Sequence, residues 1–251
     1  MSPPLLEVRE VSMSFGALRA LDSVGFEVAE GMITGIIGPN GAGKTTLFNV
    51  LAGKYRPTTG QVTFLGNDIT GFRPDRICKM GISRTYQSAR PFPGLSVANN
   101  VRVALLYGRA DDGDGGAGTG RRSAEEEIGE ILDFVELEHQ AAKRGEELIP
   151  IERKRLELAR ALATEPRLLL LDELVAGLTP AETTEMMATI RTIRERGVTI
   201  LLIEHVMKAV MGLSENIIVL HHGEMIAQGD PEAVARDESV IAAYLGSQHE
   251  V

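Results

Sequence analysis

Gly38–Thr45 reads GPNGAGKT and decides the fold of this 251-residue chain. It fits the pattern G-x-x-x-x-G-K-[ST], whose glycines let backbone N–H groups turn inward around phosphate oxygens. The stretch lies between an apolar run, Met32–Ile37, and a helical pattern that begins near Thr45. A buried strand, a glycine-rich loop and a helix in this order predict a phosphate-binding loop at the positive end of a helix dipole.

Two side chains of this loop have expected tasks. Lys44 would reach the β- and γ-phosphates of a nucleoside triphosphate, and the Thr45 hydroxyl would ligate Mg²⁺. The alternative is a glycine-rich turn without a ligand. The strand and helix on either side make that alternative the weaker interpretation.

Two adjacent carboxylates end a second apolar run. Leu168–Leu171 is followed by Asp172 and Glu173, and buried parallel strands bind ligands at their carboxyl ends. Asp172 is placed to hold Mg²⁺ through its water shell. Glu173 is suited to orient, and take a proton from, the water that attacks the γ-phosphate. A helix cap is the alternative for these acids, and the nearby phosphate loop weakens it.

Composition and charge restrict the class of protein. A hydrophobic content of 43% suits one large α/β domain, or one domain with a small subdomain. The net charge of -9 and the pI near 5.2 argue against nucleic acid as a partner. The apolar runs are far shorter than the roughly 20 residues that cross a bilayer, and the start MSPPLLEVRE does not resemble a signal peptide. We therefore expect a cytoplasmic chain that reaches a membrane only through partners.

The hydrophobic pattern predicts alternating strands and helices, and hence a mainly parallel sheet. Helical patterns without an intervening strand predict a helical subdomain. A further helix opens on Thr179–Glu182, a capping box with proline in its first turn. The glycine-rich stretch 111–120 is expected to be a surface loop. The predicted strands are 5–15, 25–28, 32–37, 61–65, 82–86, 168–171 and 198–203, and the predicted helices are 97–106, 124–137, 151–163 and 180–196.

Taken together, these motifs resemble the ATP-binding cassette (ABC) family over essentially the whole chain. Phe15 resembles the aromatic residue that stacks on adenine. Gln87, in RTYQ, resembles the Q-loop glutamine that contacts Mg²⁺ or the attacking water, and His205, ending VTILLIEH, the switch histidine at the γ-phosphate. Ala176–Thr179 resembles the D-loop of the dimer interface. The alternatives are a core phenylalanine, an exposed glutamine and a structural histidine.

The resemblance implies an α/β fold: a P-loop NTPase (ABC ATPase) core with a mainly parallel sheet, an N-terminal antiparallel β part and a helical subdomain. Residues 1–87 and 164–251 would form the core, and residues 88–163 the helical (signature) subdomain. The implied cofactors are ATP and Mg²⁺, with Glu173, His205 and Gln87 as catalytic residues and Thr45, Gln87 and Asp172 at the metal. The residues expected to bind the nucleotide are Phe15, Gly38, Pro39, Asn40, Gly41, Ala42, Gly43, Lys44, Thr45 and Thr46.

The ending GDPEAVARDESVIAAYLG and the stretch from RTYQ to PFPGLSVANNV resemble ATPase subunits of branched-chain amino acid importers. That resemblance implies a dimer that hydrolyses ATP to drive transmembrane permease subunits at the inner face of the cell membrane, with a solute-binding protein as an indirect partner. The alternatives are the ATPase of a lipid or lipopolysaccharide transport machine, a non-transport ABC ATPase, and a small-molecule kinase. A kinase would not need Gln87 and His205 at these places.

One motif of the family is missing. The signature is Leu-Ser-Gly-Gly-Gln, or Leu-Ser-Tyr-Gly-Gln in the branched-chain subfamily, whereas Leu148–Glu152 reads LIPIE. The serine is lost, Ile151 replaces the glycine near the phosphate, Pro150 lacks an N–H, and Glu152 adds negative charge. In the family this loop binds the γ-phosphate held by the other subunit. We therefore expect a degenerate half-site and a heterodimer with an intact cassette; binding through another geometry is the alternative.

Overall fold

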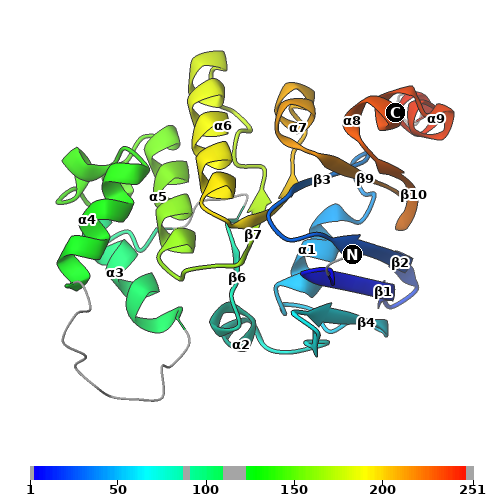
Figure 1. Cartoon of the computed structure of the whole chain (residues 1–251), viewed down its shortest axis with the longest axis horizontal. Helices are drawn as coiled ribbons and strands as arrows, with labels where there is room; N and C mark the ends of the chain where they lie inside the picture. Colours follow the sequence, from blue (N-terminus) through cyan, green and yellow to red (C-terminus); the bar gives the residue numbers. More distant parts are fainter. Residues whose placement is uncertain (1–2, 87–90, 110–122, 247–251) are drawn as a thin grey trace.

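The computed structural model describes residues 3–86, 91–109 and 123–246, whose strands form two sheets (Figure 1). The larger sheet has the order β10-β9-β3-β8-β7-β6, and its neighbours run parallel except for the antiparallel pair β9 and β10. The predicted mainly parallel sheet is thus confirmed. Its strands are β3 (Ile33–Ile37), β6 (Ile82–Arg84), β7 (Leu168–Asp172), β8 (Thr199–Ile203), β9 (Asn216–His221) and β10 (Glu224–Gly229).

The smaller sheet is antiparallel and has the order β2-β1-β4-β5. It confirms the N-terminal antiparallel part of the expected fold. Helix α1 (Lys44–Leu51) shares one buried cluster with both sheets: Phe48 packs with Phe64 of the small sheet and with Leu170 of the large one. The strands of the small sheet are β1 (Leu6–Phe15), β2 (Leu18–Val28), β4 (Thr59–Phe64) and β5 (Asn67–Asp68).

The remaining helices fall into two regions of Figure 1. Three of them, drawn in green at the left, pack on one another: α3 (Val97–Tyr107), α4 (Ala124–Phe134) and α5 (Pro150–Leu162). The others are α2 (Pro74–Lys79), which lies between β5 and β6 in the sequence, and four helices that follow β7, β8 or β10 of the large sheet: α6 (Pro180–Glu195), α7 (Met207–Leu213), α8 (Pro231–Arg236) and α9 (Glu238–Gly246). Two short 3₁₀ helices, η1 (Glu138–Gln140) and η2 (Gly145–Glu147), lie between α4 and α5 in the sequence.

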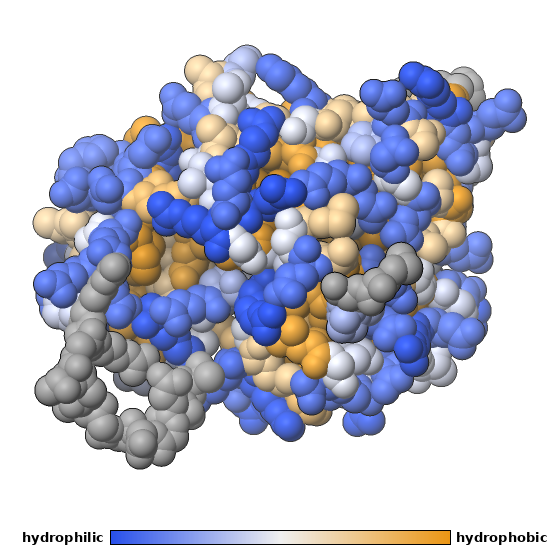
Figure 2. Space-filling view, in the orientation of Figure 1, coloured by the Kyte–Doolittle hydropathy of each residue, from blue (hydrophilic) through white to orange (hydrophobic). Residues whose placement is uncertain are grey.

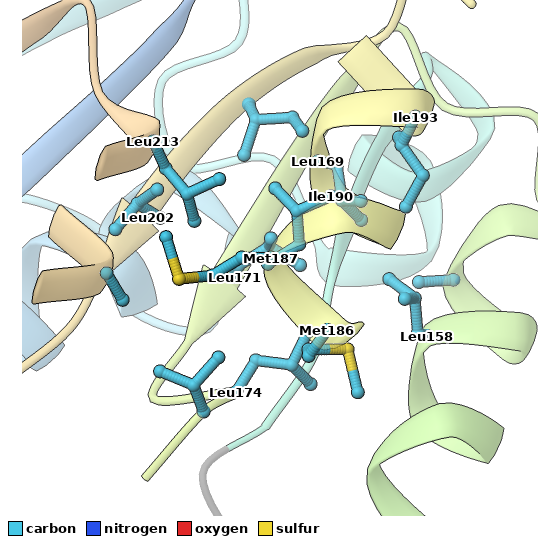
Figure 3. Close-up of a cluster of buried hydrophobic side chains, with 14 of the residues drawn as sticks. Leu158, Leu169, Leu171, Leu174, Met186, Met187, Ile190, Ile193, Leu202 and Leu213 are labelled. Atoms are coloured by element: carbon cyan, nitrogen blue, oxygen red, sulfur yellow. The ribbon is translucent and has the colours of Figure 1, made fainter. Parts of the chain in front are cut away.

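Strand β7 shows why its sequence is apolar at every position. All five of its residues are buried, and successive side chains of a strand point to opposite faces of the sheet. Leu169 and Leu171 belong to the cluster that α6 covers with Met187 and Ile190 (Figure 3). Leu168 and Leu170 belong to the cluster around α1. β7 is therefore covered on both faces, and its last residue, Asp172, lies at the carboxyl end of the strand.

The structure confirms the predicted strands and helices within a few residues at each end, except that β2 begins at Leu18, seven residues before the predicted strand 25–28. The capping box of α6 is present, with Thr179 N–H donating to Glu182 Oε2 at 2.8 Å and Glu182 N–H donating to Thr179 Oγ1 at 3.3 Å. The prediction for residues 111–120 lies outside the described residues. The sequence reading missed α2, β5 and every element after β8.

The visible face of the molecule is mostly covered by hydrophilic side chains, with apolar ones showing through in separate patches (Figure 2). Within the described part of the chain, none of the helices is both long and apolar enough to span a bilayer.

We predict that Leu169→Ala lowers the free energy of unfolding by about 2–5 kcal/mol, because it leaves a cavity in the cluster between β7 and α6. Urea denaturation measures the change. Leu106→Ala serves as a matched control, since Leu106 is 60% exposed. Equal losses in the two variants would contradict the packing described for β7.

Candidate active site

The phosphate loop depends on glycines at two crowded positions. Gly38 has φ +150° and Gly43 has φ +101°. A Cβ at Gly38 would collide with the Leu220 carbonyl, and one at Gly43 would lie 2.6 Å from the Ala20 oxygen. The loop is closed by Ala42 N–H, which donates to Pro39 O at 3.2 Å. The backbone is therefore held against β9 and the start of β2 in a shape that side chains would block.

Lys44 lies across this loop. Its Nζ donates to Gly38 O at 2.7 Å and to Pro39 O at 2.9 Å. Burial lowers the pKa of Lys44, while the charges of Glu173 and Asp172 act in the opposite direction. The ammonium group is thus positioned beside both carboxylates that the sequence singled out.

A pocket of about 680 Å³ opens over the loop, within the size range of small-molecule sites. Phe15 lines it from the end of β1, with its ring edge-on to Tyr55 at 5.2 Å between centroids. His222, in the turn between β9 and β10, also lines it and was not predicted. The described lining residues are Phe15, Leu18, Arg19, Ala20, Asn40, Gly41, Ala42, Gly43, Lys44, Thr45, Thr46, Glu173, His205 and His222.

Asp172 is buried and paired with an arginine that the sequence reading missed. Arg84 Nη2 donates to Asp172 Oδ2 at 2.6 Å, and Arg84 Nη1 donates to Asn49 Oδ1 at 2.7 Å. Asp172 N–H donates to Thr85 Oγ1 at 3.2 Å. The only signal for Arg84 was its place at the end of a strand that pairs with β7.

Glu173 and His205 meet at the carboxyl ends of β7 and β8. His205 Nε2 and Glu173 Oε1 are 2.8 Å apart. Glu173 has φ +52°, a left-handed conformation that non-glycine residues seldom adopt, and its N–H donates to Ile203 O at 2.9 Å. A strained residue held by the neighbouring strand is typical of a functional position.

The described residues suit Mg²⁺ bound together with a nucleotide. No group of three or more His, Cys, Asp or Glu able to hold a metal occurs within the ranges that the structure covers. Magnesium needs no such group, because it binds through one or two carboxylates, phosphate oxygens and water. Thr45, exposed at the start of α1, and the buried Asp172 offer such oxygens. Gln87 lies outside the described residues.

The loop in the signature position is closed by its own carboxylate. Pro150 is the first residue of α5. Glu152 Oε2 accepts from Ile149 N–H at 3.0 Å, and Glu152 Oε1 accepts from Gln140 Nε2 at 2.9 Å. The Glu152 carboxylate therefore lies at the positive end of the α5 dipole, where an anion would otherwise bind.

Comparison with known proteins identifies the family. Residues 21–176, more than half of the chain, match the family model described as ABC transporter. The chain belongs to the ABC transporter family. Its fold and its phosphate loop are those of the family's ATPase, and the chain hydrolyses ATP. Residues 224–250 match a second model, described as branched-chain amino acid ATP-binding cassette transporter.

Similar proteins extend over nearly the whole cassette. The chain is 40% identical to the high-affinity branched-chain amino acid transport ATP-binding protein BraF of Pseudomonas aeruginosa, over 98% of this chain and 99% of BraF. It is 41% identical to LivG of Salmonella typhimurium, with the same coverage. The ADP conformation of MJ1267, an ATP-binding cassette of an ABC transporter, superimposes with a TM-score of 0.85 at 30% identity, covering 98% of this chain and all of that one.

We predict that Lys44→Ala weakens MgATP binding by roughly 100-fold, because charged hydrogen bonds contribute up to about 3 kcal/mol each. Calorimetric titration of the purified chain measures the affinity. Lys79→Ala, which removes an exposed lysine of α2, is the control. An unchanged affinity in the Lys44 variant would exclude its assignment to the phosphates.

Proposed function

We propose that the chain is the MgATP-hydrolysing subunit of an importer of branched-chain or related amino acids. The observation that carries the substrate class is the match of residues 224–250 to the branched-chain cassette model. Full-length similarity to BraF and LivG, which are branched-chain amino acid transport ATP-binding proteins, supports it. A lipid or lipopolysaccharide transport ATPase remains the alternative that a transport assay excludes.

The nucleotide lies along the pocket over the phosphate loop. Phe15 is exposed at the mouth of the pocket, where its ring can stack on adenine. Lys44 exchanges its carbonyl partners for the β- and γ-phosphates. Pro39 has no N–H and contributes only to the shape of the loop. The backbone N–H groups that bind the phosphate oxygens belong to Gly38, Asn40, Gly41, Ala42, Gly43, Thr45 and Thr46.

Thr45, Asp172 and Gln87 would hold a magnesium ion, which would supply positive charge beside the phosphate oxygens. Arg84 fixes the Asp172 carboxylate at the end of β7 through their 2.6 Å contact. Asp172 is thus oriented before the nucleotide arrives.

Glu173 acts as the general base that takes a proton from the attacking water. Its carboxylate lies 2.8 Å from His205, so the two side chains orient each other. His205 is more exposed than Glu173, at 43% against 15% of their side chains, and can contact the γ-phosphate from the open side of the pocket. Gln87 contacts the metal ion or the attacking water.

Permease subunits hold the chain at the inner face of the cell membrane, with the cytoplasm on its other side. A second cavity, of about 370 Å³, lies between α2, β6, α3 and α5. Tyr86 and Tyr107, 52% and 75% exposed, lie at this cavity, and Tyr86 directly precedes Gln87. An exposed aromatic surface next to a catalytic segment suits a protein partner that controls hydrolysis.

A heterodimer completes the active site. Glu152 occupies the N-terminus of α5 in this chain, so a homodimer would face each phosphate loop with a closed signature. A partner cassette with an intact signature would supply the missing donors. The cassette MJ0796, which is dimeric, is 25% identical to this chain and superimposes with a TM-score of 0.78, covering 90% of this chain and 98% of MJ0796. Its dimer supports association between cassettes.

The proposal is tested in the complex purified from native membranes and reconstituted in liposomes. We expect leucine, isoleucine or valine to be taken up with ATP hydrolysis, and Glu173→Gln to slow both by roughly 10²–10⁴-fold, the range for loss of a general base. ATP affinity should stay unchanged. Uptake of other solutes alone would overturn the substrate class, and wild-type turnover would exclude Glu173 as the base.

The asymmetry of the dimer makes a separate prediction. Glu173→Gln in this chain should remove most of the ATP turnover. The matching glutamate-to-glutamine change in the partner cassette should remove little of it. The reason is that the strong site combines this chain's phosphate loop with the partner's signature, and one lost donor at such a site costs a few kcal/mol. Steady-state ATPase assays measure both variants. Equal losses, or brisk hydrolysis by this chain alone, would contradict the heterodimer.

A further inference from the structure

Glu204 is a buried acid that no motif of the sequence singled out. It directly follows β8 and precedes His205, and it is only 5% exposed. Its Oε1 accepts from Val175 N–H at 2.7 Å. Its Oε2 is buried and, among the residues that the structure covers, has no hydrogen-bond partner. A carboxyl group kept in such a place at a cost to stability needs an explanation.

The bond to Val175 restrains the loop that carries Glu173. Val175 lies two residues beyond Glu173 and before α6, and is itself buried. Glu204 and His205 are neighbours on the other side of this bond. One hydrogen bond therefore links the backbone beyond Glu173 to the strand end from which His205 extends, and helps to set the 2.8 Å separation of their side chains.

Lys154 brings a third element to the same place. From α5, its Nζ donates to the Glu173 carbonyl at 2.9 Å. Burial lowers the pKa of Lys154, and the charges of Glu204 and then Glu173 oppose that change. The charged or titratable groups around Glu204 are Lys154 from α5, Glu173 from the loop after β7 and His205 beside it.

We propose that Glu204 is a positioning residue for ATP hydrolysis. Its carboxylate holds Val175 N–H and attracts Lys154, and these two ties fix the loop of Glu173 against His205 and α5. The inference rests on the proposed roles of Glu173 and His205. It gives α5 a second role, in which Lys154 supports the Glu173 loop of the same chain. This role does not depend on the altered signature at Leu148–Glu152.

The state of the carboxyl group should control this support near neutral pH. Burial raises the pKa of Glu204 to about 7, while the Val175 N–H and the Lys154 charge limit the rise. Above pH 7 the ionised group attracts Lys154 and accepts a strong hydrogen bond. Below pH 7 the neutral group loses its attraction for Lys154, so turnover should fall on the acid side.

The experiment uses the assembled transporter with Glu204→Ala, Glu204→Gln and the control Glu195→Gln, an exposed acid of α6. We expect the Ala variant to lower kcat by roughly 10–100-fold, the scale of a misplacement of about 1 Å, with KM for ATP within about twofold. The Gln variant keeps an acceptor for Val175 and should restore most of kcat. Its acid limb near pH 7 should be lost, and an unchanged limb in this variant would overturn the control of turnover by the Glu204 carboxyl group.

A second measurement separates positioning from folding. Raising the pKa of Glu204 from 4.5 to about 7 means that the folded state binds a proton that the unfolded state releases, so burial destabilises the chain increasingly between these pH values. Glu204→Gln removes that effect and should raise Tm at pH 8 but not at pH 4.5. A reduced kcat in Glu204→Ala without a lowered Tm supports the proposal; a kcat loss that follows a fall in Tm, or wild-type kcat in Glu204→Ala, overturns it.

Lys154→Ala completes a double-mutant cycle with Glu204→Ala. If the two residues act together, the combined variant should lose less kcat than the product of the single losses. Multiplying losses would show that Glu204 does not act with Lys154. Glu173→Gln is run in parallel: wild-type turnover there would overturn the proposed function, whereas slow Glu173→Gln with normal Glu204→Ala would overturn only the positioning role.

Discussion

A buried ammonium group needs oxygen atoms around it, and the placement of Lys44 imposes this constraint on the rest of the site. The Gly38 and Pro39 carbonyls accept its hydrogen bonds, and the charges of Glu173 and Asp172 stabilise its protonated form. Those carboxylates lie near Lys44 because β7, which carries them, pairs with β8, and β8 pairs with β3, which leads into the phosphate loop. The strand order of the large sheet thus provides the negative charges that a buried, protonated Lys44 requires.

The same order gathers the remaining groups. β3 leads into the phosphate loop, β8 into Glu204 and His205, β7 into Asp172 and Glu173, and β6 ends at Arg84. Because the four strands are parallel neighbours, their carboxyl ends meet at one edge of the sheet. Two of the three adjacent pairs of ends are joined by a side-chain contact: Arg84 to Asp172 between β6 and β7, and Glu173 to His205 between β7 and β8.

The features that could be predicted from the sequence are those encoded by residues close to one another in the chain. Lys44 ends the glycine-rich loop after one apolar run, and Asp172 and Glu173 follow another, so local motifs placed them in the pocket or beside it. Arg84 and Glu204 act across 88 and 29 residues of sequence, and no local pattern encodes such partners. The short helices and strands after β8 have too few residues for a clear hydrophobic periodicity. The boundaries of the subdomain at 88–163 and the role of Gln87 stay predictions.

Helix α5 combines two features that agree with a division of labour between cassettes. Its N-terminus, which would have to face a partner's phosphate, is neutralised by Glu152 within the chain. Two residues further on, Lys154 turns to the Glu173 carbonyl of the same chain. Under the proposed function, the closed α5 N-terminus leaves the Lys154 contact intact, because Glu152 and Lys154 bind different groups of the chain. A chain under this constraint can keep a complete hydrolytic site of its own while contributing little to the site of its partner.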